Sequence, residues 1–214
     1  MQPTTIALLG GAGRTGRFLL HHLLTSGYHV RALVRHPELF DYAHPALEIV
    51  PGDALDFLCI THLLQGCNAV LSTIGQRKDE PLVALQVTAH LLEAMQQASI
   101  SRYIVLAGVN VDAPGDHKGP AAQQATAWMH LHFPDAHADR QRSFELLQAS
   151  NLAWTMLRVP FIHFEEGSGN LLVELRDCTA QQVMAGDIAR FMVTALQHNR
   201  YLRQAPFVSS RSTL

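Results

Sequence analysis

The 214-residue sequence carries little charge of either sign. Charged side chains make up 16% of the chain, and 16 Lys and Arg nearly balance 18 Asp and Glu, which leaves a formal net charge of −2. A chain without a basic excess presents no electrostatic footprint for a polyanion. We therefore expect no nucleic-acid partner.

Cysteines and long hydrophobic runs are also scarce. The three cysteines, Cys59, Cys67 and Cys178, are widely separated, which excludes a disulfide framework or a zinc ribbon and indicates buried thiols in a reducing compartment. No run approaches the roughly 18 apolar residues of a membrane span, and the opening segment has neither the basic stretch nor the cleavage signal of a secretory leader. We expect a cytoplasmic protein without membrane contact.

Thirteen histidines do not form a recognisable metal site. The densest group is His130, His132 and His137. Side chains at i and i+2 share a face of a strand but not of a helix, and no cysteine or carboxylate completes the set. We predict that the chain binds no metal.

Short apolar runs alternate with longer segments of helical period, which is typical of a parallel sheet covered on both faces. We predict strands at residues 5–10, 29–34, 47–50, 69–73, 102–107 and 153–159, and helices at 14–26, 55–65, 81–98, 135–150 and 185–198. No repeat or boundary divides the chain. The predicted fold is one doubly wound α/β domain over residues 1–214.

Two segments carry more specific expectations. Pro81 suits the first turn of its helix, and one buried stripe should follow from Leu82, Leu85, Ala89, Leu92 and Met95. The late helix should bury Asp187, Ile188, Phe191, Met192 and Ala195. Residues 110–134, with three prolines and two glycines, predict a long irregular loop that is functional or mobile.

A glycine cluster separates the first predicted strand from the first helix in TIALLGGAGRTG. A tight turn, backbone amides close to a pyrophosphate, and a helix packed on the strand each exclude a β-carbon. The spacing fits both G-x-G-x-x-G and G-x-x-G-x-x-G, and no G-K-[ST] follows, so a nucleoside-triphosphate loop is excluded. The predicted dinucleotide-binding residues here are Gly10, Gly11, Gly13, Arg14, Thr15 and Gly16.

The end of the second strand indicates which dinucleotide binds. An acidic residue at this position accepts from the ribose hydroxyls of NAD, whereas a basic one accommodates the 2′-phosphate of NADP. The sequence reads Val34, Arg35 and His36, with no carboxylate before Glu38. We predict NADP, with NADPH preferred over NADH, and expect Arg14 to approach the same phosphate; a merely solvated Arg35 is the alternative.

Further cofactor contacts are expected at the carboxyl ends of the later strands, because that edge of the sheet forms the crevice. Asp53 would accept a hydrogen bond from the adenine amino group. The remaining predicted cofactor residues are Thr73, Ile74 and Gly75 after the fourth strand, Ala107 and Gly108 at the end of the fifth, and Pro160 and Phe161 after the sixth.

Segments along almost the whole chain resemble the atypical short-chain dehydrogenase/reductase family: LLGGAGRTGRFLL, LVRHPE, GDALD, AVLSTIG, SRYIVLAGVN, FELLQASNLAWTMLRVPFI and MAGDIARFMVTAL. Within it, the chain is most similar to the group of NmrA-like regulators and NAD(P)H-dependent flavin reductases, which includes biliverdin reductase B. The resemblance is weakest over residues 110–138. It implies a Rossmann sheet that carries NADP, with residues 160–214 forming a small substrate-side portion.

The chain departs from the family pattern in its catalytic residues. Family dehydrogenases use a Tyr-x-x-x-Lys pair, aided by a Ser after the fifth strand. Here the lysines are Lys78 and Lys118, none of the four tyrosines has that spacing, and Ala107-Gly108-Val109-Asn110 offers no hydroxyl. The departure disfavours an alcohol dehydrogenase, and makes an epimerase or dehydratase the weakest reading.

Hydride transfer to a flavin or quinone-like acceptor remains, because such acceptors draw protons from solvent and need little help from a protein acid. We expect the acceptor between residues 108–110 and residues 160–162, with Phe161 as an apolar wall or, alternatively, as ordinary core packing. The candidate catalytic residues are Arg142 and His163, beside Arg140 and Arg158. Arg142 could instead pair with Glu145 or Asp139 on its own helix.

Two functional hypotheses follow. The first is an NADPH-dependent reductase of a small-molecule acceptor. The second is an NmrA-like redox sensor that binds NADP(H) without turnover and changes its affinity for a protein partner. Both fit a complete dinucleotide site without a tyrosine–lysine pair, and the sequence leaves the oligomeric state open.

Overall fold

The computed structural model describes residues 4–76, 80 and 82–211, and its centre is an eight-stranded sheet. The sheet order is β3-β2-β1-β4-β5-β6-β10-β8, parallel except for the antiparallel pair β10–β8. The strands are β1 (Thr5–Leu9), β2 (His29–Val34), β3 (Leu47–Pro51), β4 (Ala69–Ser72), β5 (Arg102–Gly108), β6 (Ala153–Val159), β8 (Leu171–Glu174) and β10 (Phe207–Ser210). The first six follow the Rossmann order, so the predicted doubly wound fold is confirmed.

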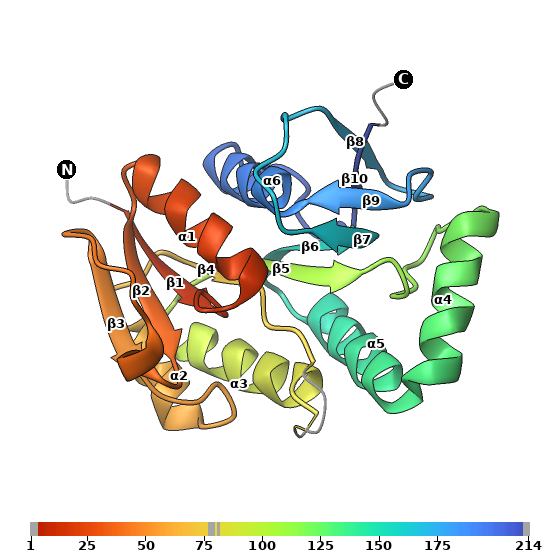
Figure 1. The fold of residues 1–214 in the computed structure, drawn as a ribbon. Helices are drawn as coiled ribbons and strands as arrows, with labels where there is room; N and C mark the ends of the chain where they lie inside the picture. The colour runs from red at the N-terminus through yellow and green to blue at the C-terminus, as the bar shows by residue number, and fades with distance from the viewer. Residues whose placement is uncertain (1–3, 77–79, 81, 212–214) are drawn as a thin grey trace.

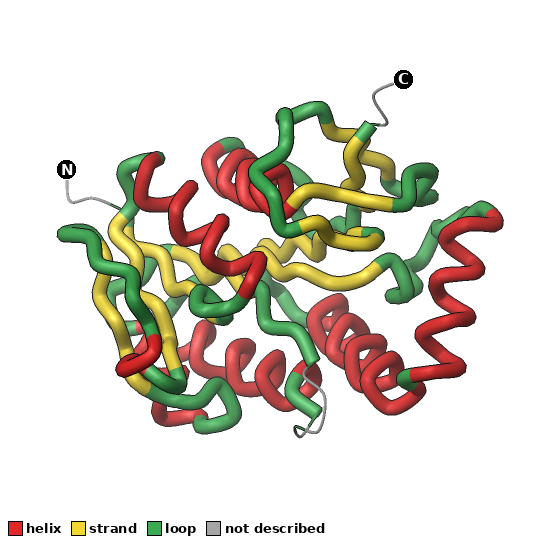
Figure 2. The backbone as a smooth tube through the Cα atoms, in the orientation of Figure 1, coloured by secondary structure: helices red, strands yellow, loops and turns green. Residues whose placement is uncertain are grey.

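Helices cover both faces of this sheet (Figure 1; Figure 2). On one face lie α1 (Arg14–Thr25) and α6 (Ala185–Gln197); on the other lie α2 (Phe57–Leu64), α3 (Ala84–Gln97) and α5 (Pro134–Ala149). A short 3-10 helix, η1 (Pro37–Leu39), follows β2. None of the described helices is both long and apolar enough to span a bilayer.

Strand β1 shows why the sequence pattern specified this layering. Successive side chains of a strand point to opposite faces, so Ile6 and Leu8 belong to the core under α1 and α6, while Ala7 and Leu9 belong to the core under α2, α3 and α5. Because both faces are buried, the run is apolar throughout rather than alternating.

Helix α3 differs from its prediction in start and in buried face. It begins at Ala84; Pro81 lies outside the described residues. Its buried residues are Ala84, Val87, Thr88, Leu91, Ala94 and Met95. The predicted stripe was therefore wrong except for Met95: Leu82 and Ala89 are exposed, and Leu85 and Leu92 lie at the edge of the buried face. The helix packs on both α2 and α5, and its buried face includes the small residues Ala84 and Ala94, which a search for large apolar side chains does not select. The predicted stripe of α6 is confirmed, since all five residues are buried.

The predicted loop at residues 110–134 was also wrong over its second half. Residues Pro120–His132 form α4, and α5 begins at Pro134. Proline suits the first helical turn, and the Ala/Gln run has high helix propensity. Only Ala122 of α4 is buried, so the helix lacks the hydrophobic period on which the prediction depended. It stands beside α5, beyond the end of β5 (Figure 1).

The residues after β6 complete the main sheet and also form a second sheet of two strands. Strand β7 (Phe161–His163) pairs in parallel with β9 (Gln182–Met184). The chain then forms α6 and returns as β10, which inserts between β6 and β8. These four strands were not predicted from the sequence, because three or four residues are too few to show a period.

Candidate functional site

Three of the four glycines in the loop after β1, Gly10, Gly13 and Gly16, have different surroundings. Gly10 has a φ of +80°, and its carbonyl accepts from the Gly13 amide at 2.9 Å, which closes the turn. A β-carbon on Gly16 would lie 1.9 Å from the Gly10 oxygen. A β-carbon on Gly13 would meet only that oxygen, at 3.1 Å, and would otherwise point into open space. Gly10 and Gly16 are thus required for packing, whereas Gly13 leaves a bare face.

That bare face lies at the start of α1. Gly13 is the N-cap residue, it provides no side-chain cap, and the first turn of α1 contains no acidic residue. The first amides of a helix need acceptors, and the helix dipole favours an anion there. The start of α1 has the chemistry of a phosphate-binding site.

The segment after β4 lies directly against this loop. The Thr73 amide donates to the Leu9 carbonyl at 3.0 Å, and the Thr73 hydroxyl donates to the Gly10 carbonyl at 3.2 Å. A β-carbon on Gly75 would meet nothing within 4 Å. Arg140 on α5 donates to the Ile74 carbonyl at 2.8 Å, so α5 also fixes this segment. The structure therefore brings the predicted residues after β1 and β4 together.

The carboxyl end of β2 carries an ion pair that the sequence did not indicate. Arg35 donates to both carboxylate oxygens of Glu80, at 3.0 and 3.2 Å. This pairing raises the pKa of Arg35, and the charge of Asp53 acts in the same direction. Asp53 also accepts from the Leu55 amide at 2.9 Å, in the turn before α2. Arg35 and Asp53 thus share one corner of the site, with Glu80 in contact with the guanidinium.

Arg14 lies elsewhere. Its guanidinium sits over the ring of Phe164, 4.1 Å from the ring centre, so the structure does not bear out its expected approach to the group at Arg35. Phe161, at the start of β7, is 70% exposed and contacts the ring of His163 at 5.1 Å. The core-packing alternative for Phe161 was wrong.

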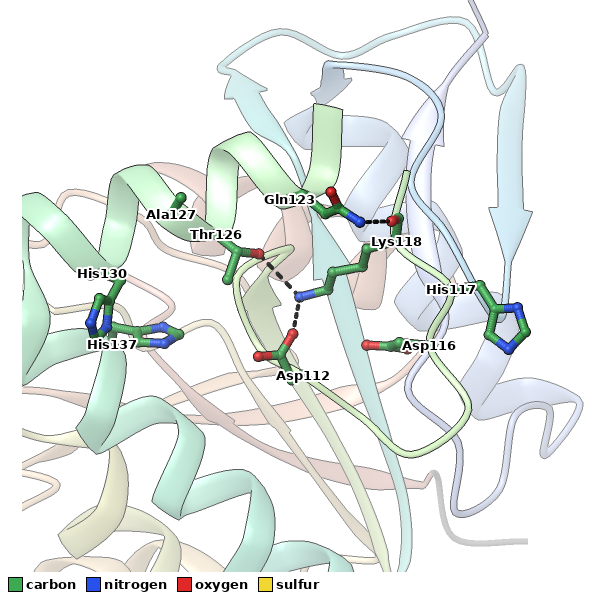
Figure 3. A pocket seen from close by; sticks show the side chains of 9 residues that line it. All are labelled: Asp112, Asp116, His117, Lys118, Gln123, Thr126, Ala127, His130 and His137. Carbon is green, nitrogen blue, oxygen red and sulfur yellow. Dashed lines mark hydrogen bonds and ion pairs between the residues drawn. The ribbon is translucent and has the colours of Figure 1, made fainter. Parts of the chain in front are cut away.

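The loop after β5, α4 and α5 line an open cavity of about 640 Å³ (Figure 3). It is lined by Asp112, Asp116, His117, Lys118, Gln123, Thr126, Ala127, His130 and His137. The ammonium group of Lys118 donates to Asp112 at 2.5 Å and to Thr126 at 3.1 Å (Figure 3). This cavity differs from the predicted acceptor pocket, because its described lining residues include none of residues 160–162.

Two histidines lie at one end of this cavity. The rings of His130 on α4 and His137 on α5 meet edge to face, with centres 5.6 Å apart. The amide nitrogen of Asn110, a buried residue just after β5, lies 3.0 Å from Nδ1 of His137. Burial lowers the pKa of His137; His130 and Lys118 lower it further, and Asp112 opposes them. From the sequence these histidines were weighed as metal ligands and assigned instead to a flexible loop. The signals for the two helices that bring them together were Pro120 and Pro134, each in a first helical turn.

The other polar candidates have structural surroundings. Arg158 on β6 is 1% exposed and donates to both oxygens of Asp116, at 2.5 and 2.8 Å, and to the Val111 carbonyl at 3.0 Å. It therefore fixes the β5–α4 loop from beneath. Arg142 is exposed on α5 and does not pair with Asp139, whose carboxylate accepts from the Ala84 and Leu85 amides.

His163 is half-buried beside Phe161, outside the lining of the cavity. Within the described ranges, no three His, Cys, Asp or Glu side chains are grouped so as to hold a metal ion.

Comparison with solved structures gives the same fold over nearly the full chain. An oxidoreductase, ylbE, from Lactococcus lactis is 20% identical, with a TM-score of 0.82 and coverage of 98% of this chain and 92% of that one. A short-chain dehydrogenase/reductase from Veillonella parvula in complex with NADP is 18% identical, with a TM-score of 0.80 and coverage of 98% and 96%. ChuY, an anaerobilin reductase from Escherichia coli O157:H7, is 17% identical, with a TM-score of 0.80 and coverage of 99% of each chain.

Curated relatives match over shorter stretches. The photosystem II assembly factor Ycf39 of Trieres chinensis is 30% identical over 113 residues, which are 50% of this chain and 35% of that protein. A 3 beta-hydroxysteroid dehydrogenase/Delta 5-->4-isomerase of Mycobacterium tuberculosis is 30% identical over 135 residues, 54% of this chain and 36% of that protein. The matched region thus spans about a third of the length of these relatives. The NAD(P)H-binding family matches residues 10–199, and the chain belongs to that family.

Proposed function

We propose that the protein is an NADPH-dependent reductase of a small flavin or quinone-like acceptor. The observation that carries the proposal is the bare face of Gly13 at the uncapped start of α1, on the same sheet edge as the cavity after β5. A dinucleotide bound along this edge would supply the hydride from its reduced nicotinamide. The protein supplies binding and orientation.

The described residues form a cradle that fits the dinucleotide. The first amides of α1, next to Gly13, would hold the diphosphate, and Gly75 leaves room for the adenosine to pass over. Arg35 and Asp53 would bind the adenine-proximal end, and Gly108 marks the nicotinamide end, beside Asn110. Two solved neighbours support this assignment by their descriptions, one as an NADP complex and one as a reductase.

The preference for NADPH rests on Arg35, which donates to Glu80 through both terminal nitrogens of its guanidinium group. A 2′-phosphate would need the same bidentate donors, so it has to displace the carboxylate. We expect Arg35→Gln to lower NADPH affinity while leaving NADH affinity nearly unchanged, and Glu80→Gln to raise NADPH affinity. Calorimetric titration of both cofactors measures this. An unchanged preference in Arg35→Gln would overturn the phosphate assignment.

The test of the reductase itself is turnover. Stopped-flow mixing of NADPH-loaded protein with a panel of flavins and quinones should oxidise the cofactor. The alternative is the NmrA-like redox sensor, favoured by the missing tyrosine–lysine pair and by a relative named as an assembly factor. A sensor binds oxidised cofactor at least as tightly as reduced and shows no oxidation with any acceptor.

A further inference from the structure

The cavity after β5 is built around charged and polar groups whose positions are fixed. Lys118 is only 7% exposed, and its ammonium group is held between Asp112 and Thr126. Gln123 donates to the Lys118 carbonyl at 2.6 Å. Asp116 is held by Arg158 from the other side. Each carboxylate thus has its own cation, which leaves the imidazoles as the groups of the cavity able to exchange a proton near neutral pH.

Of these imidazoles, His137 is the one connected to the predicted cofactor edge. Asn110, 7% exposed, contacts it through the amide nitrogen. The amide oxygen of Asn110 lies 2.4 Å from where a Gly108 β-carbon would be. Asn110 therefore fills the space above Gly108 and positions the His137 ring beside it. Nε2 of His137 has no hydrogen-bond partner among the residues that the structure describes.

We propose that this cavity receives the acceptor and that His137 is the general acid of the reduction, with Asn110 as its positioning residue. This inference rests on the proposed reductase function. In the reaction, the acceptor would gain a hydride from NADPH, which leaves as NADP⁺, and a proton on a heteroatom from the imidazolium Nε2 of His137. With both ring nitrogens protonated, the Asn110 amide presents its oxygen to Nδ1–H, so that the amide accepts from the charged ring and donates to the neutral one. The neutral imidazole then regains its proton from water, so that one NADPH and one proton are consumed for each acceptor reduced.

The surroundings of His137 determine the expected pH dependence. The groups that act on its charge are His130 on α4 and Lys118 and Asp112 in the β5–α4 loop. Burial and the two cationic neighbours place the pKa below the ordinary value of 6.5. Because the protonated form donates, kcat/KM for the acceptor should fall as the pH rises through this lowered pKa. Removing His130 should move this falling limb of the pH profile to higher pH.

The experiment compares wild type with His137→Gln and with His130→Gln as the matched control. We measure kcat/KM between pH 5 and 9, NADPH affinity, and the ring titration of each histidine by NMR, where His137 is the signal absent from His137→Gln. We expect His137→Gln to lower kcat about 10²-fold or more, as for loss of a general acid, and to remove the limb while NADPH affinity stays within about twofold. His130→Gln should keep the limb at a higher pH, and the wild-type kinetic and NMR pKa values should agree.

The outcomes separate this inference from the proposed function. A wild-type protein that oxidises NADPH, with the limb unchanged in His137→Gln, overturns the role of His137 alone. A kinetic pKa that disagrees with the NMR value of His137 does the same, and this comparison requires no activity from the variant. A wild-type protein that binds NADPH but oxidises it with no acceptor overturns the reductase and this inference together.

Discussion

At the residue scale, the glycines after β1 meet two different requirements, which are close packing of the loop and room for a ligand. Gly16 has no room for a side chain, because its β-carbon would overlap the Gly10 carbonyl. At Gly13 a β-carbon would meet only the Gly10 oxygen, at 3.1 Å, so a shift of a few tenths of an ångström accommodates it in the protein alone. A glycine that the fold does not need is accounted for by a ligand that approaches the backbone.

Gly13→Ala should separate binding from folding. The added methyl changes the free energy of unfolding by no more than about 1 kcal/mol, because alanine is a poorer cap but restricts the unfolded chain. It should lower NADPH affinity at least about tenfold, by holding the diphosphate away from the helix amides. Gly16→Ala should lower both affinity and stability, the latter by about 1–3 kcal/mol. Titration and urea unfolding measure the two effects, and unaltered affinity in Gly13→Ala would contradict the account.

Residue roles were predictable from the sequence only where they depend on local spacing. The glycine loop is such a case, since its meaning follows from a strand before it and a helix after it. The Arg35–Glu80 and Asn110–His137 contacts join residues 45 and 27 positions apart, and no local pattern indicates either. The candidates Arg142 and His163 were chosen by proximity to strand ends, and the structure places them outside the lining of the cavity.

At the element scale, α5 organises its neighbours through one buried carboxylate. Asp139 accepts from the Ala84 amide at 2.7 Å and from the Leu85 amide at 3.3 Å. It thereby caps the start of α3 from another helix and explains why α3 begins at Ala84. The next residue along the helix, Arg140, fixes the segment after β4.

Asp139→Asn should lower the free energy of unfolding by about 1 kcal/mol, because an amide oxygen replaces only part of a charged cap. Asp135→Asn, in the exposed first turn of the same helix, should change it by no more than a few tenths of a kcal/mol. Urea unfolding of both variants measures the difference. Equal changes in the free energy of unfolding for the two variants would contradict the capping role of Asp139.

Element prediction succeeded where burial imposes a period and failed where it does not. Strands β1 and β5 are apolar on both faces, and α6 has a clear buried stripe. Helix α4 buries only Ala122 while exposing Trp128 and Leu131. Its formation depends on Pro120 and on the helix propensity of its Ala/Gln run. A search for a hydrophobic period alone therefore assigns these residues to a loop.

At the scale of the whole molecule, two separate hydrophobic clusters each contain a thiol that burial keeps neutral. Cys67 belongs to the core under α2, α3 and α5, and Cys178 to a small cluster beside Phe207. Burial raises the pKa of each thiol to about 11, from an ordinary value of 9.0. The native protein therefore binds more protons than the unfolded chain between these values.

Stability should accordingly fall as the pH rises from 9 to 11. The slope is up to about 1.4 kcal/mol per pH unit for each thiol, since the unfolded chain ionises first. Replacing both residues by alanine should flatten the dependence below pH 10, above which unfolded tyrosines also ionise. Urea unfolding across this range tests the assignment, and an identical slope in the double variant would refute it.

The central claim is that the backbone at the start of α1 holds the diphosphate of NADPH, with the rest of the cofactor along the carboxyl edge of the sheet. The most direct measurement is a crystal structure of the protein with NADPH. The account predicts the diphosphate on the amides next to Gly13, the 2′-phosphate at Arg35 in place of Glu80, and the nicotinamide beside Gly108. A diphosphate bound anywhere else, or a loop that stays empty at saturating cofactor, would contradict it.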